Sequence, residues 1–136
     1  MRRIIFTINY SEPTGLCGIR PEAKLDDPSV SWVWDRLERL RMSLVLDLGA
    51  AGTRSYQTEA VRGIAGKHED LRIVIAHLAH PGPAVRTEPD LWRAWERHID
   101  LGRMPNVWFD TASLPAYLSE EGFPYPSATR YIRCRA

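Results

Sequence analysis

The sequence predicts an α/β fold built from parallel strand–helix units, and two observations support that prediction. Short apolar segments rich in β-branched residues alternate with longer segments whose apolar residues recur at helical spacing. The second, third and fourth apolar segments begin near residues 44, 73 and 107, a spacing that matches the units of a (β/α)8 barrel of roughly 250 residues. We therefore expect residues 1–136 to form one partial domain, about half of a TIM barrel.

Four strands are expected, in segments enriched in Val, Ile and Leu. They cover Arg3–Asn9, Leu44–Leu48, Leu71–His77 and Val107–Asp110. The third contains consecutive apolar residues, which is typical of a parallel strand covered on both faces. Because consecutive units of this kind are joined by right-handed crossovers, we expect the strands to pair in parallel and in chain order.

Helices are expected between and after these strands. Asp27-Pro28 predicts a capped start for a helix over Ser29–Arg41, and a second helix is expected near Ser55–Lys67. Thr87 is expected to cap a third helix. Pro126 is expected to open the last one.

Composition excludes several classes of partner. The 18 basic and 17 acidic residues are spread along the chain, which gives no footprint for nucleic acid or for an anionic membrane surface. No apolar stretch approaches the roughly 20 residues that span a bilayer. Cys17 and Cys134 form neither a metal-binding spacing nor a disulfide framework. We expect a cytoplasmic protein, because disulfides are rare in the cytosol and these two cysteines form no framework.

A polar residue closes each predicted strand, and these four residues are the candidate site. They are Asn9, Asp47, His77 and Asp110. In parallel α/β folds, ligands bind at the carboxyl ends of the strands. Each of them could serve as a metal ligand, a general base or a substrate hydrogen-bond partner. Among these roles we expect catalysis from Asp47 and His77, metal binding from His77, and substrate binding from Asn9 and Asp110. The alternative is that strand ends are simply solvated, since Asn and Asp also favour turns.

The other histidines are interpreted as structural. His80 lies in a proline-rich loop, His68 at a helix end and His98 late in another helix. No His-x-His, HExxH, CxxC, GxGxxG or Walker sequence is present, so no complete metal or nucleotide motif is recognised.

Several segments resemble the amidohydrolase-related (amidohydrolase 2) family of TIM-barrel metal-dependent hydrolases, and they occur in family order. The segments are LDDPSVSWVWDRLERLRMSLVLDLG, KHEDLRIVIAHLAHP, PNVWFDTASLP and FPYPSATRYIR. The resemblance implies a hydrolase or decarboxylase (a lyase) that uses a divalent metal such as zinc on a small carboxylate, amide or lactone. His77 matches the histidine of the family's sixth strand, and Asp47 stands where the fifth strand has a histidine. The family's paired histidines and terminal aspartate have no match, so the chain resembles roughly strands four to seven.

Three alternatives stay open at this point. The chain could be part of such an enzyme, a non-catalytic α/β domain that keeps the scaffold, or an unrelated flavodoxin-type sheet. If it is a half-barrel, its unpaired edge strands predict a homo-oligomer. With only His77 and Asp47 as ligands, we expect the chain alone to bind metal weakly and to lack activity.

Overall fold

A parallel sheet forms the centre of the chain. The computed structural model describes residues 5–11, 15–16, 24–114 and 122–133, with side chains described from residue 24 onward. The strands are β1 (Ile5–Ser11), β2 (Gly15–Leu16), β3 (Ser43–Asp47), β4 (Arg72–Ile75) and β5 (Val107–Phe109), in the order β2-β1-β3-β4-β5. The short β2 is antiparallel to β1, and every other pairing is parallel. The prediction of four parallel strands in chain order is confirmed.

The helices connect these strands, much as the apolar periodicity predicted. They are α1 (Ser31–Arg39), α2 (Thr58–Lys67), α3 (Pro89–Ile99) and α5 (Pro126–Arg133). The side chain of Asp27 accepts a hydrogen bond from the Ser29 amide, which confirms the predicted cap at the start of the first helical segment. The predicted cap at Thr87 is wrong, because Glu88 occupies the N-cap of α3. The Thr87 hydroxyl instead donates to the Ala84 carbonyl and closes the preceding turn.

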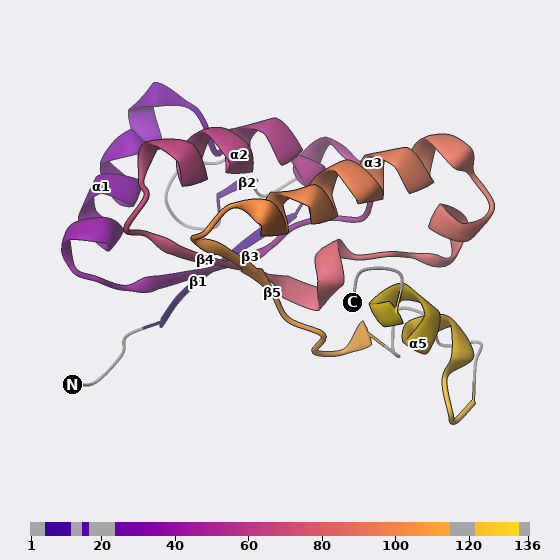
Figure 1. Cartoon of the computed structure of the whole chain (residues 1–136). Helices are drawn as coiled ribbons and strands as arrows, with labels where there is room; N and C mark the ends of the chain where they lie inside the picture. Colours follow the sequence, from indigo (N-terminus) through magenta and orange to yellow (C-terminus); the bar gives the residue numbers. More distant parts are fainter. Residues whose placement is uncertain (1–4, 12–14, 17–23, 115–121, 134–136) are drawn as a thin grey trace.

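The main core lies between the sheet and one layer of helices. Figure 1 shows α1, α2 and α3 on one side of the sheet, with α5 (yellow) apart from that layer. Burial alternates along β3 and β4, so that Leu44, Leu46, Ile73 and Ile75 are buried while the residues between them keep partial exposure. Only one face of these two strands is therefore fully covered within the described part of the chain.

The predicted third strand was too long at its end. β4 stops at Ile75, and the chain then turns over Ala76–Ala79, with left-handed backbone at His77 and Leu78, instead of continuing extended to His77. This turn decides where the candidate site residues point. No helix in the described ranges has the length and apolar character needed to cross a membrane.

Candidate metal centre at the carboxyl edge of the sheet

The four predicted site residues lie at one edge of the sheet. Asp47 is the last residue of β3, and Asn9 of β1 is its register partner. His77 lies just beyond the end of β4, and Asp110 lies just beyond the end of β5. The side chain of Asn9 lies outside the described residues. The parallel register thus brings the strand ends together as the sequence predicted.

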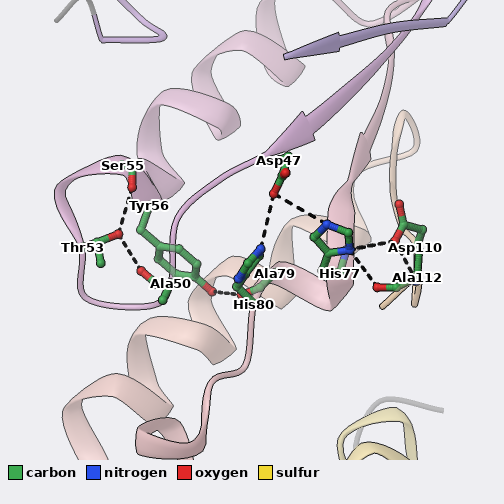
Figure 2. Close-up of polar contacts among 10 residues, drawn as sticks. All are labelled: Asp47, Ala50, Thr53, Ser55, Tyr56, His77, Ala79, His80, Asp110 and Ala112. Atoms are coloured by element: carbon green, nitrogen blue, oxygen red, sulfur yellow. Dashed lines mark hydrogen bonds and ion pairs between the residues drawn. The ribbon is translucent and has the colours of Figure 1, made fainter. Parts of the chain in front are cut away.

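Asp47, His77 and His80 form a compact group. The Asp47 Oδ1 atom lies 3.8 Å from His77 Nε2 and 3.3 Å from His80 Nε2. One ligand atom from each residue lies within 4.8 Å of the other two. Figure 2 shows both imidazoles directed toward the carboxylate, from the turn that follows β4. All three side chains are partly buried.

A backbone carbonyl fixes the tautomer of His77. Its Nδ1 atom lies 2.7 Å from the carbonyl oxygen of Ala112. Because a carbonyl only accepts hydrogen bonds, Nδ1 must carry the proton, which leaves the lone pair of a neutral ring on Nε2. That lone pair faces Asp47. A histidine that ligates a metal has the same arrangement, with its second nitrogen donating to a carbonyl or carboxylate.

The two imidazoles are presented by a left-handed turn. The φ angles of His77, Leu78, Ala79 and His80 are 56°, 50°, 56° and 49°. Left-handed backbone costs residues other than glycine about 1–2 kcal/mol each. Such a turn persists only where surrounding contacts hold it, and turns of this kind concentrate at functional sites.

Asp110 supplies part of that support. Its Oδ1 atom accepts hydrogen bonds from the amides of His77 (2.9 Å) and Ala112 (3.0 Å). Its backbone carbonyl accepts a hydrogen bond from the amide of Leu78 at 2.7 Å. Asp110 therefore shapes the turn through one carboxylate oxygen and its backbone carbonyl. Its predicted role in substrate binding, like that of Asn9, stays a prediction.

Electrostatics favour a neutral His80. Burial lowers the pKa of His80 and the neighbouring His77 adds to this, while the charge of Asp47 and a hydrogen bond to it act in the opposite direction. The neutral imidazole is the form that binds a metal ion. The position of His80 in a proline-rich loop predicts a structural residue, whereas the structure places it beside Asp47. The signal that could have identified it is the His77-x-x-His80 spacing directly after a strand.

The remaining histidines lie away from this group. His68 is buried at the end of α2, with Nδ1 3.0 Å from the Glu38 carboxylate. His98 is buried in α3, with Nδ1 2.9 Å from the Thr58 hydroxyl. Both contacts join elements that are distant in sequence, as expected for structural residues.

The geometry of the group fits a divalent cation. Ligand atoms about 2.0–2.2 Å from a tetrahedral zinc ion lie roughly 3.4 Å from one another. The separations of 3.3 and 3.8 Å are close to that value. Two imidazoles and one carboxylate with an open position is also a composition found in catalytic zinc sites. The fold and this group together define a parallel α/β protein with a candidate metal centre at its strand ends.

The chain belongs to the amidohydrolase family, whose family model matches residues 17–134. The resemblance predicted from the sequence is thus confirmed. No curated protein matches the chain.

Two solved structures are similar to it. One is an uncharacterised TIM-barrel protein from Bordetella bronchiseptica, with 17% identity and a TM-score of 0.46 over 77% of this chain and 33% of that one. The other is described as an amidohydrolase II, with 14% identity and a TM-score of 0.44 over 94% of this chain and 51% of that one. The chain spans about a third and about half of the lengths of these two proteins.

Proposed function

We propose that this chain forms part of a metal-dependent amidohydrolase-type enzyme in which Asp47, His77 and His80 hold a divalent cation. The supporting observation is the convergence of one carboxylate oxygen and two imidazole nitrogens at neighbouring strand ends, with His77 Nδ1 anchored on Ala112. We propose zinc as the cation, since two imidazoles and one carboxylate form a ligand set found in catalytic zinc sites.

The residues at this edge of the sheet would have different roles in the reaction. When bound, the cation would supply Lewis acidity that polarises a substrate carbonyl and makes water a better nucleophile. Asp47 would balance the positive charge and, with the carboxylate oxygen that does not bind the cation, would accept a proton at the open position. His77 would serve the reaction as a ligand, since its Nε2 would hold the cation and its Nδ1 donates to the Ala112 carbonyl. Asn9 and Asp110, at the same edge, are proposed to bind the substrate. We propose a small carboxylate, amide or lactone as substrate, with hydrolysis or decarboxylation as the reaction.

Zinc titration by calorimetry after dialysis against a chelator tests the metal site. The wild-type chain should bind one zinc ion, more tightly than two ligands alone would allow, because His80 adds a third. Changing His77, His80 or Asp47 to alanine should each weaken zinc binding by about tenfold or more, because each removes one of three ligands. As a control, Asp90→Asn removes an exposed carboxylate that pairs with Arg93 on α3, and should leave zinc affinity unchanged. Binding that survives all three site substitutions would refute the assignment.

A scaffold without catalytic activity is the second candidate for the chain taken alone. The observation that favours it is the open face of the sheet, where Val45 and Val74 are partly exposed and Trp108 is 46% exposed. A closed barrel would cover that row of register partners. We expect zinc binding without turnover of amides, esters or lactones. Turnover that follows zinc occupancy and disappears in His77→Ala would refute the hypothesis that the chain alone is a scaffold without activity.

A further inference from the structure

Two buried side chains from other elements hold the carbonyl groups of the left-handed turn. The Tyr56 hydroxyl donates a hydrogen bond to the Ala79 carbonyl at 2.9 Å, a contact visible in Figure 2. The indole Nε1 of Trp95 donates to the Leu78 carbonyl at 3.0 Å. Tyr56 is 5% exposed and Trp95 is 0% exposed. Both acceptor carbonyls therefore lie where water cannot readily replace a lost donor.

These contacts counteract the intrinsic preference of the turn. Residues 77–80 contain no glycine, so their backbone would relax toward right-handed or extended conformations if nothing opposed it. Relaxation would rotate the carbonyls of Leu78 and Ala79 away from the two donors and leave buried polar groups unsatisfied. It would also redirect the imidazoles on either side of these carbonyls, those of His77 and His80.

Local structure brings Tyr56 to this position. The loop after β3 folds back through a hydrogen bond from the Thr53 hydroxyl to the Ala50 carbonyl at 2.7 Å. The Tyr56 amide then donates to the Thr53 carbonyl at 3.2 Å, within the 3₁₀ turn Arg54–Tyr56. The His98 ring packs against the Tyr56 ring with centroids 4.5 Å apart. Burial raises the pKa of Tyr56, so its hydroxyl keeps the proton that it donates.

We propose that Tyr56 and Trp95 are positioning residues for the metal centre, because together they hold the turn that presents His77 and His80 to Asp47. This inference rests on the proposed function for its consequence in metal binding. The two hydrogen bonds from Tyr56 and Trp95 to the turn, which we call the clamp, can also be tested without metal. Neither residue would touch the metal or the substrate.

The first test is a cobalt titration, followed by visible absorption, at a temperature where every variant is folded. Tyr56→Phe and Trp95→Phe each remove one donor and should weaken cobalt binding by about threefold to tenfold, with an altered cobalt spectrum. Trp34→Phe is the matched control, because Trp34 Nε1 also donates to a buried backbone carbonyl, that of Leu25, at 3.0 Å. It should lower the melting temperature similarly and change cobalt affinity by less than about twofold.

The second test is amide hydrogen exchange in the absence of metal. The amides of Leu78 and His80 are bonded within or beside the turn, to the carbonyls of Asp110 and His77. They should exchange about tenfold faster in Tyr56→Phe and Trp95→Phe, but not in Trp34→Phe. A wild-type chain that binds no cobalt, with this exchange pattern intact, would refute the metal site and support the clamp. Unchanged exchange, unchanged cobalt affinity in a metal-binding chain, or equal weakening in Trp34→Phe would overturn the positioning role.

Discussion

Replacing His98 with glutamine is expected to make the folded chain less sensitive to acid. His98 is fully buried in α3, and within the described part of the chain its Nε2 atom has no hydrogen-bond partner. Burial, and then the charge of Arg62, lower the pKa of His98 from 6.5 to about 4. The folded state therefore resists a proton that the unfolded chain accepts readily.

The sign and size of the effect follow from that difference in pKa. Below pH 6.5 the unfolded chain binds more protons at His98 than the folded chain, so stability falls as the pH falls from 6.5 toward 4. One pKa unit corresponds to about 1.4 kcal/mol, which limits the total loss to about 3 kcal/mol. At pH 5 the loss from this residue should be about 2 kcal/mol.

Urea unfolding at pH 7 and at pH 5 measures this loss as a difference in unfolding free energy. The comparison between the two pH values removes any constant cost of the substitution itself. The wild-type chain should lose about 2 kcal/mol more than His98→Gln between these values. His68→Gln serves as a control, since it alters another buried histidine but leaves His98 in place. Equal losses in the wild type and in His98→Gln would refute the reasoning.

Three further predictions concern the scaffold. Asn106→Ala should lower the unfolding free energy by about 2–4 kcal/mol in urea titrations, because the side-chain NH2 group of Asn106 shares its two hydrogens among three buried carbonyls. A loss below about 1 kcal/mol would contradict this. Gly49→Ala should lower the unfolding free energy by about 1–3 kcal/mol, since a Cβ there would overlap Ser55 Oγ. Adding Ser55→Ala should recover part of that free energy, and no recovery would contradict the proposed overlap. Trp108→Lys, on β5, should reduce the self-association predicted for the chain when light scattering is compared across concentrations. A wild-type chain that stays monomeric would contradict the predicted association.

The order of the elements could be read from the sequence because the signals for it are local. Apolar runs mark the strands, helical periodicity marks the segments between them, and Asp27-Pro28 marks one helix start that the structure confirms. The parallel pairing then follows from crossover topology, which places the ends of consecutive strands at one edge. Asp47, His77 and Asp110 could therefore be grouped without any knowledge of their contacts.

The conformation of the turn after β4 could not be read in this way. Histidine occurs in left-handed backbone more often than most residues, but Leu78 and Ala79 do not share that preference, and the apolar run before His77 instead predicted a strand that continued to it. The turn depends on donors and acceptors far away in sequence, such as Tyr56, Trp95 and Ala112. Only the tertiary structure brings these groups together, and it alone places His80 beside Asp47. Contacts over long sequence separations can outweigh local propensity because a buried carbonyl without a donor costs as much as a strained residue.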